Sequence, residues 1–208
     1  LVFYGWARPV FLILLAGEAL AAYGFALRLE KRDRPGRRIV FVASLAALLA
    51  PLLVFKYSDF LLQAFRPGGS GAILGLILPA GISFYTFKAL SYVIDVGRGR
   101  IAAERNPVLV GAYITFFPQI LAGPIERAAP LLAQLRGGYR FDLGRAAGGF
   151  RLLLWGLFKK IVVADRMAQY VNIVFETPAD YAGLGLVIGL IFYSFQIYCD
   201  FSGYSDMA

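Results

Sequence analysis

The chain has 208 residues, of which 59% are apolar and only 16% are charged, and its mean hydropathy is +0.67. So little polar surface excludes a soluble globule of this length and indicates an integral membrane protein. The formal net charge is +8, histidine is absent, and the single cysteine, Cys199, excludes an internal disulfide and a thiolate metal cluster, so we predict no metal site.

The first third of the chain predicts two membrane spans. Pro9 to Leu27 is an apolar run whose only charge is Glu18, and at about 1.5 Å per residue it is long enough to cross roughly 30 Å of hydrocarbon. A second span is predicted from Ile39 to Phe55, with a kink at Pro51. The loop between them, Arg28 to Arg38, contains six cations and is expected on the cytoplasmic side.

A third span and a broken segment are predicted next. After a flexible connection at Pro67 to Gly71, the third span runs from about Ala72 to Val96 and ends at a basic loop. Asn106 to Ile125 is apolar, but Pro118 and Gly123-Pro124 interrupt it, and both of its flanks are basic. We therefore predict a re-entrant or broken helix, which must be buried because broken backbone at membrane depth needs protein or water to satisfy its amides.

The last third predicts a cytoplasmic connector from Arg127 to Arg151, which could include a short surface helix, and a helix from about Phe150. Lys159-Lys160 is expected to reach an interface with its charges in water. Met167 to Gly183 has acids but no Lys or Arg, as expected of a loop outside the cytoplasm, and Gly183 to Cys199 is the last span. About fourteen cations fall on the predicted inner side and only Arg8, Lys56 and Arg66 on the outer side. We predict one incomplete multi-pass membrane domain over residues 1–208 and no nucleic-acid partner.

The last seventeen residues, Phe192 to Ala208, place two acids at the end of an apolar run. Acids near a bilayer are candidate functional residues. On a helix, Gln196 and Asp200 share one face, and a break is expected after Gly203. The candidates for positioning a hydroxyl substrate or a histidine are Gln196, Asp200, Ser202, Tyr204, Ser205 and Asp206. The alternative is that Asp200 and Asp206 only cap a helix end and pair with Arg98 or Arg127.

Two further groups of polar residues are candidates for the lining of a passage. Gln119 lies in the broken segment, and Arg127 could hold an anionic part of an acyl donor by bidentate hydrogen bonds. The alternative is a structural kink with Arg127 at the level of the lipid phosphates. A weaker case is made by residues of the third span, where Lys88 and Asp95 lie nearly on one face together with Ser83, Tyr85 and Thr86.

Four stretches of the chain carry a resemblance to a known family. They are GISFYTFKALSYVIDVGRG at 81–99, FFPQILAGPIER at 116–127, LFKKIVVADRMAQYVN at 157–172 and FQIYCDFSGYSDMA at 195–208. Their order and spacing resemble the membrane-bound O-acyltransferase family, in its bacterial branch around alginate O-acetyltransferase. The first third of the chain resembles that family only in hydropathy.

The resemblance implies an all-α, multi-pass enzyme of the bacterial inner membrane, with a ring of helices around a tunnel. Such an enzyme transfers an acyl group, usually acetyl, to hydroxyls of an extracytoplasmic polysaccharide such as alginate, together with periplasmic partner proteins. The family's catalytic histidine follows the DFSGYSD segment and is expected beyond residue 208, so no catalytic residue is assigned here and this piece is expected to be inactive alone. No bound cofactor is expected. A coenzyme A or carrier-protein donor is inferred from the family only.

Two other classes of function remain open from the residues. A transporter could pass an acyl group across the membrane and leave ester formation to a periplasmic transferase, and a lined tunnel suits it equally well. A histidine in the rest of the gene would favour chemistry over transport. A purely structural scaffold does not explain why polar groups recur in the segments around Asp95, Gln119 and Asp200.

Overall fold

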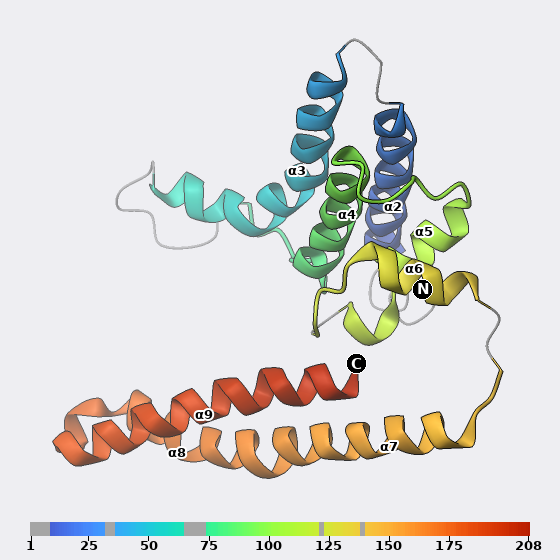
Figure 1. Cartoon of the computed structure of the whole chain (residues 1–208). Helices are drawn as coiled ribbons and strands as arrows, with labels where there is room; N and C mark the ends of the chain where they lie inside the picture. Colours follow the sequence, from blue (N-terminus) through green and yellow to red (C-terminus); the bar gives the residue numbers. More distant parts are fainter. Residues whose placement is uncertain (1–8, 32–35, 65–73, 121–122, 138–139) are drawn as a thin grey trace. The chain divides into compact units, whose positions relative to one another are not determined.

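The structure, a computed structural model, describes residues 9–31, 36–64, 74–120, 123–137 and 140–208. Within these residues every regular element is a helix (Figure 1). The α-helices are α2 (Pro9–Glu30), α3 (Arg37–Ala64), α4 (Ile82–Gly97), α5 (Pro107–Ile114), α6 (Ala128–Arg136), α7 (Leu143–Leu157), α8 (Asp165–Glu176) and α9 (Gly183–Met207). Short helical turns are η1 (Phe117–Gln119), η2 (Phe158–Ala164) and η3 (Pro178–Asp180). The predicted all-α fold class is confirmed.

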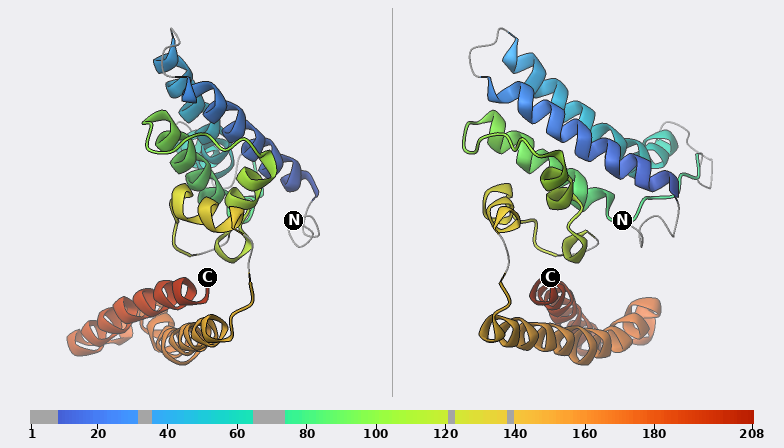
Figure 2. Two further views of the ribbon diagram at one scale, coloured as in Figure 1. Left: turned by 45° about the vertical axis from the view of Figure 1, so that its right-hand side comes forward. Right: turned by 90° about the vertical axis from the view of Figure 1, so that its right-hand side faces the viewer.

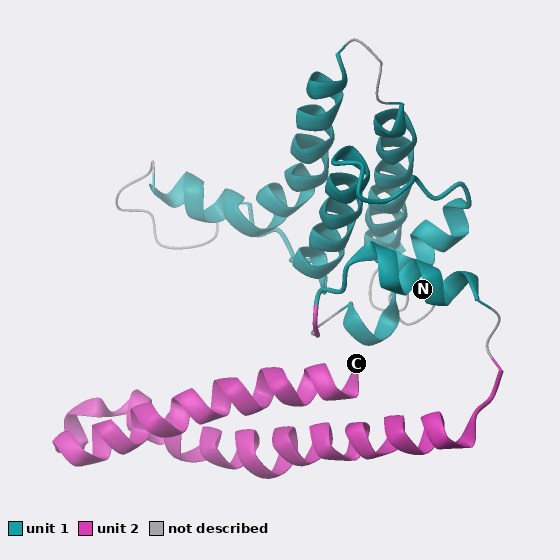
Figure 3. Ribbon diagram, in the orientation of Figure 1, with its two compact units in different colours: residues 1–121, 125–138 teal, residues 122–124, 139–208 magenta. Residues whose placement is uncertain are grey.

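The chain divides into two compact units (Figure 3). Unit 1 comprises residues 1–121 and 125–138, and unit 2 comprises residues 122–124 and 139–208. A single membrane domain can contain more than one compact unit, so the one-domain organisation stays a prediction, as does the ring around a tunnel.

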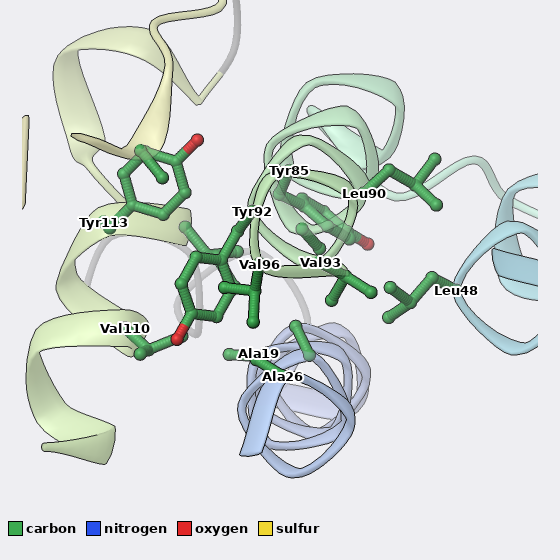
Figure 4. Close-up of a cluster of buried hydrophobic side chains, with 14 of the residues drawn as sticks. Ala19, Ala26, Leu48, Tyr85, Leu90, Tyr92, Val93, Val96, Val110 and Tyr113 are labelled. Carbon is green, nitrogen blue, oxygen red and sulfur yellow. The ribbon is translucent and has the colours of Figure 1, made fainter. Parts of the chain in front are cut away.

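Unit 1 is built around α4, which packs against α2, α3 and α5 (Figure 2). α2 buries alanines at helical spacing, Ala19, Ala22 and Ala26, and their small side chains let its backbone approach α4 closely. Figure 4 shows Leu48 of α3 on one side of α4, and Tyr113 of α5 on the other. The rings of Tyr92 and Tyr113 lie 6.4 Å apart between centroids. The core is therefore tightly packed around the helix that carries the first family-like stretch.

Among the described residues, three helices are long and apolar enough to cross a membrane: α2, α3 and α9. α2 matches the span predicted from Pro9 to Leu27. α3 is longer than predicted, because it continues past Phe55 to Ala64. Pro51 lies inside α3, and Figure 1 shows the second half of this helix running in a different direction from the first. That change fits the missing N–H of proline and confirms the predicted kink.

The third predicted span is wrong in its first half. Residues 74–81 are not helical, and α4 begins only at Ile82, which leaves 16 residues or roughly 24 Å of helix. Gly81 explains the late start, because its φ of +72° is left-handed. Its backbone also lies so close to the next segment that an added Cβ would sit 2.0 Å from the carbonyl oxygen of Ile120. A helix of this length is too short for a simple crossing.

The segment from Asn106 to Ile125 is broken, as predicted. α5 ends at Ile114, and the single 3₁₀ turn η1 contains Pro118. Asn106 caps α5 by accepting a hydrogen bond from the Val108 N–H at 2.9 Å. Val110, Tyr113 and Ile114 are fully buried within the core of unit 1. The prediction that this segment lies inside the fold is confirmed for these residues but not for the whole segment, because Val108 and Phe117 are exposed.

Two carboxylates fix the loop between α4 and α5. Glu30 accepts a hydrogen bond from the Ala103 N–H at 3.1 Å and pairs with Arg105 at 2.5 Å. Glu104 accepts one from the Asn106 N–H at 3.0 Å and pairs with the Arg136 guanidinium of α6. Burial raises the pKa of Glu104, but these donors lower it by more, so its pKa lies below the ordinary value of 4.5.

Acid should therefore destabilise unit 1 through Glu104. A carboxyl whose pKa is lower in the folded than in the unfolded state contributes stability above pH 4.5, and this stability is lost as the pH falls through the folded pKa. We expect the Tm of the full-length protein to be steady near pH 6 and to fall below about pH 4.5. Glu104→Gln should lower the Tm near pH 6 and flatten the fall in acid. An equal acid fall in both proteins would contradict this role.

Unit 2 is a helical hairpin in which α9 packs along α7, η2 and α8 (Figure 1). α7 begins at Leu143, capped by Asp142, whose carboxylate accepts a hydrogen bond from the Arg145 N–H at 2.7 Å. η2 is a π-helix. The loop predicted from Met167 to Gly183 is wrong in its first ten residues, because α8 continues to Glu176. The short helix predicted after Arg127 is confirmed as α6.

Some predicted features lie outside the described residues. They are the glycine-rich connection at Pro67 to Gly71, the outer cations Arg8 and Arg66, and residues 32–35 of the first basic loop. The assignment of inner and outer sides stays a prediction.

Candidate functional site

The predicted polar cluster of unit 2 forms where α9 meets the π-helix η2. A π-helix turns by fewer degrees per residue than an α-helix, and such turns are frequent at functional sites. Here it carries two consecutive lysines, and both contact α9. Lys159 Nζ lies 2.6 Å from the Asp206 carboxylate and 2.8 Å from the Ser202 hydroxyl. Lys160 Nζ lies 2.7 Å from Asp200 and 2.9 Å from Asp165 of α8.

Two glycines make this contact possible. An added Cβ at Gly203 of α9 would lie 2.8 Å from the Gly156 carbonyl oxygen, and one at Gly156 of α7 would lie 2.6 Å from the Gly203 carbonyl oxygen. The two backbones therefore touch without intervening side chains. This close approach lets the lysine side chains reach the carboxylates of α9 while they are only 17% and 27% exposed.

Aromatic rings border both lysines. Lys159 Nζ lies 5.8 Å from the centroid of the Trp155 ring, and Lys160 Nζ lies 5.7 Å from that of Tyr204. A ring face within about 6 Å stabilises a cation. Each lysine is thus held by carboxylates on one side and an aromatic face on another.

Two predictions about this cluster are wrong. α9 does not break after Gly203 but continues to Met207, because Gly203 serves as a helix contact and Ser205 donates a hydrogen bond back to the Phe201 carbonyl at 2.9 Å. Within unit 2, Asp200 pairs with Lys160 and Asp206 pairs with Lys159. Lys159 and Lys160 are also paired and partly buried, and not simply in water as predicted.

The other candidates on α9 differ in their exposure and in their hydrogen bonds. Gln196 is half-buried one turn before Asp200, and its Oε1 makes no hydrogen bond to any described residue. Tyr204 is exposed, and the Ser205 hydroxyl is used within its own helix. Asp200 keeps 42% of its side chain exposed, against 24% for Asp206. Asp200 therefore offers a polar group that an incoming group could reach, whereas the Oε1 of Gln196 is buried without a partner among the described residues.

The two candidates in unit 1 lie in different surroundings. Gln119 is buried in η1, and its Oε1 makes no hydrogen bond within the part of the chain that the structure describes. Arg127 is exposed and directly precedes α6. A buried amide without a partner fits the prediction of a lined interior, whereas the position of Arg127 fits either of its two interpretations.

Lys88 and Asp95, which the sequence places nearly on one face of α4, contact different neighbours. Lys88 is buried and its ammonium donates to the Tyr113 carbonyl at 3.2 Å, between the rings of Tyr113 and Phe116. Asp95 instead pairs with Arg100 at 3.3 Å. Two residues seven apart thus have separate roles, because each has a nearer partner in the adjoining loop or helix.

Besides Lys88, the buried polar side chains of unit 1 include Glu18 and Thr86. Glu18 of α2 is 5% exposed, and Thr86 of α4 is fully buried. Neither carboxylate oxygen of Glu18, nor the Thr86 hydroxyl, makes a hydrogen bond of normal geometry in the described structure. Buried polar groups without partners are costly, so they mark positions of interest in a helix that otherwise packs alanines.

The sequence missed the two lysines of η2 as members of the site. The available signal was the pair itself, since two adjacent cations in an apolar helix need partners. A π-helical turn cannot be read from spacing, because it changes the face on which each residue lies. Among the described residues, no group of three His, Cys, Asp or Glu side chains could hold a metal ion.

The arrangement in unit 2 suits positioning better than direct chemistry. Its charges are balanced in pairs, and the acceptor that stays accessible is the carboxylate of Asp200 on its exposed side, while the amide oxygen of Gln196 is buried one turn away. A carboxylate held in this way can orient a histidine or a hydroxyl within about 2.6 to 3.2 Å. General base chemistry itself would need a further group.

Comparison with known proteins identifies relatives along the whole chain, although no family model matches it. A protein of Pseudomonas putida named "Probable alginate O-acetylase" is 35% identical over 216 residues, which cover 100% of this chain and 44% of the relative. The "Peptidoglycan O-acetyltransferase" of Helicobacter pylori is 30% identical, covering 100% of this chain and 45% of the relative. The "Teichoic acid D-alanyltransferase" of Bacillus subtilis is 23% identical over 86% of this chain.

The chain spans less than half the length of these relatives. The similarity includes the first third of the chain, where the sequence alone offered only hydropathy. These relatives are named for the transfer of acetyl or D-alanyl groups. Their names agree with the family resemblance of the four sequence stretches and with the long apolar helices of this chain. The chain belongs to the membrane-bound O-acyltransferase family.

Proposed function

We propose that the protein containing this chain is an O-acyltransferase of the bacterial inner membrane that acetylates hydroxyl groups of an extracytoplasmic polysaccharide. The observation that carries the proposal is similarity over the entire chain to proteins named for O-acetylation of alginate and of peptidoglycan. The three candidate spans support a membrane location. The transport alternative is not favoured, since the relatives are named for transfer.

The proposed reaction forms an ester from an alcohol and an acyl thioester. The hydroxyl oxygen of the sugar attacks the acyl carbonyl, the carbon–sulfur bond breaks, and the hydroxyl proton passes through a base to the leaving thiolate. A coenzyme A or carrier-protein thioester on the cytoplasmic side is the donor that we propose. Export proteins in the periplasm would present the polymer.

Within this reaction, we assign Asp200 and Gln196 to positioning. The two residues lie one helical turn apart on the same face of α9. Lys160 fixes one side of the Asp200 carboxylate, whose side chain is 42% exposed, and the Oε1 of Gln196 is buried without a partner among the described residues. They would orient a histidine or a sugar hydroxyl that the rest of the protein brings to this face. Lys159, with Asp206 and Ser202, holds the end of α9 in place.

Asp200→Asn in the full-length protein should reduce acetylation. The substitution keeps the shape of the side chain but removes the charge that orients a base, so we expect ester acetate on the exported polymer to fall at least about tenfold. The protein is expressed with its operon partners, and its amount in the membrane is measured alongside. Asp180→Asn, at an exposed position of η3, is the matched control and should acetylate normally. Unchanged acetylation in Asp200→Asn would remove this residue from the mechanism.

A further inference from the structure

A pocket of about 440 Å³ lies in unit 1, between the start of α3 and the end of α4. Its lining consists of three arginines, one aromatic ring and a glycine: Arg37, Arg38, Arg98, Phe41 and Gly97. Gly97 lies close to Phe41, since an added Cβ would lie 2.7 Å from the Phe41 ring. No step of the proposed reaction uses this pocket.

Arg37 is part of the framework of the pocket. Its Nε donates to the Leu29 carbonyl at the end of α2 at 3.2 Å, and its guanidinium also donates to the Gly97 carbonyl at the end of α4. The last carbonyls of a helix lack partners within the helix. Arg37 therefore ties the ends of α2 and α4 to the first residue of α3, which fixes the position of the pocket.

Arg38 and Arg98 are different, because both are exposed and neither guanidinium makes a hydrogen bond or ion pair within the described residues. The described carboxylates at this end of unit 1 are already paired with other arginines: Asp95 with Arg100, Glu30 with Arg105, and Glu104 with Arg136. Two guanidinium groups at one pocket thus lack a counter-charge among the residues that the structure describes. A planar guanidinium binds phosphate by two parallel hydrogen bonds.

The pocket lies at the level where lipid phosphates are expected. α2 ends at Glu30 and α3 begins at Arg37, and both are candidate membrane spans, so the chain between them marks the surface of the bilayer. Phe41 lies about one turn into α3, on the side of the hydrocarbon. Basic pockets between spanning helices are known to hold anionic lipid headgroups.

We propose that this pocket binds the phosphate of an anionic phospholipid, such as phosphatidylglycerol. Arg38 and Arg98 contact the phosphate oxygens, and Phe41 contacts the glycerol and the first carbons of the acyl chains. The Phe41 ring favours a lipid over free phosphate, which carries no hydrocarbon to cover the ring. Coenzyme A has an adenine ring that could cover Phe41, so the test compares it directly with the lipid. The site does not depend on the proposed acyl transfer.

The test measures binding of short-chain lipids to the purified full-length protein in detergent. Dioctanoyl phosphatidylglycerol is titrated against the protein, with dioctanoyl phosphatidylcholine and coenzyme A in parallel. We expect phosphatidylglycerol to bind most tightly. The double variant Arg38→Gln/Arg98→Gln should weaken this binding by at least about tenfold, because it removes the charged donors to the phosphate.

The matched control is Arg28→Gln/Lys31→Gln, which removes two exposed cations at the same end of unit 1 but none from the pocket lining. This variant should bind phosphatidylglycerol as the parent does, which separates the pocket from a general effect of net charge. Equal loss in both double variants would overturn the proposal. Tighter binding of coenzyme A than of phosphatidylglycerol, lost in the pocket variant, would overturn the lipid assignment.

Discussion

Gly203→Leu is expected to separate α9 from α7 and η2 and to abolish acetylation by the full-length protein. Even a methyl group at this position would lie 2.8 Å from the Gly156 carbonyl oxygen and 3.2 Å from the Lys160 backbone nitrogen. Both neighbours are backbone atoms, so they cannot rotate away. Overpacking of this kind costs about 3 kcal/mol or more. The displacement would also withdraw Asp206 and Ser202 from Lys159.

The measurement is the Tm of the purified full-length protein together with ester acetate on the polymer. We expect a Tm lowered by at least about 5 °C and acetate near background. Gly149→Leu on α7 is the matched control, because its Cβ would meet open space and leucine favours a helix over glycine. A Gly203→Leu protein with the parent's Tm and acetylation would show that the two backbones do not touch.

Gly81→Ala should destabilise unit 1 about as strongly as Gly203→Leu destabilises unit 2. Two costs add at this residue. A side chain in the left-handed region costs about 1 to 2 kcal/mol, and the new Cβ would lie 2.0 Å from the Ile120 carbonyl oxygen, which forces the broken segment to move. We expect a loss of about 3 to 5 kcal/mol in the free energy of unfolding.

Gly75→Ala provides a control that separates these two costs. Gly75 also has a left-handed φ, of +57°, but an added Cβ there would meet no atom within 4 Å. Its loss should be limited to the backbone strain, about 1 kcal/mol. Denaturant titration of both full-length variants gives the comparison. Equal losses would mean that the contact with Ile120 contributes nothing.

Hydropathy and charge were enough to predict the helical class and the position of two spans. The run from Pro9 to Leu27 and that from Gly183 to Cys199 are apolar over a length that only a helix can use in a membrane. Proline and glycine were equally informative in the segment from Asn106 to Ile125, since both residue types interrupt a helix by local geometry.

The start of α4 and the path of α9 were both predicted wrongly, for different reasons. Residues 74–81 are as apolar as a span, but they contain Pro79 and two glycines with left-handed φ, Gly75 and Gly81, so hydropathy outweighed local signals that were present. Gly203 suggested a break because glycine is a poor helix former, but its contact with Gly156 makes it necessary within the helix. There a tertiary contact outweighs local propensity.

The sequence predicted which residues of α9 form the candidate site, but not which residues pair with them. The acids of α9 and Ser202 do lie together, as the polar cluster indicated. Their lysine partners, Lys159 and Lys160, come from about forty positions earlier in the chain and from a π-helical turn. Residue spacing could not reveal these partners, because they are distant in sequence and the π-helical turn changes the face on which each lysine lies.

Whether this chain belongs to a working polysaccharide O-acyltransferase is decided by ester acetate on the exported polymer of the source cells. The gene that encodes the full-length protein is deleted and then restored on a plasmid. We expect acetate to disappear on deletion while polymer export continues, and the restored gene to return it. A polymer acetylated to the same extent with and without the gene would contradict the proposed function.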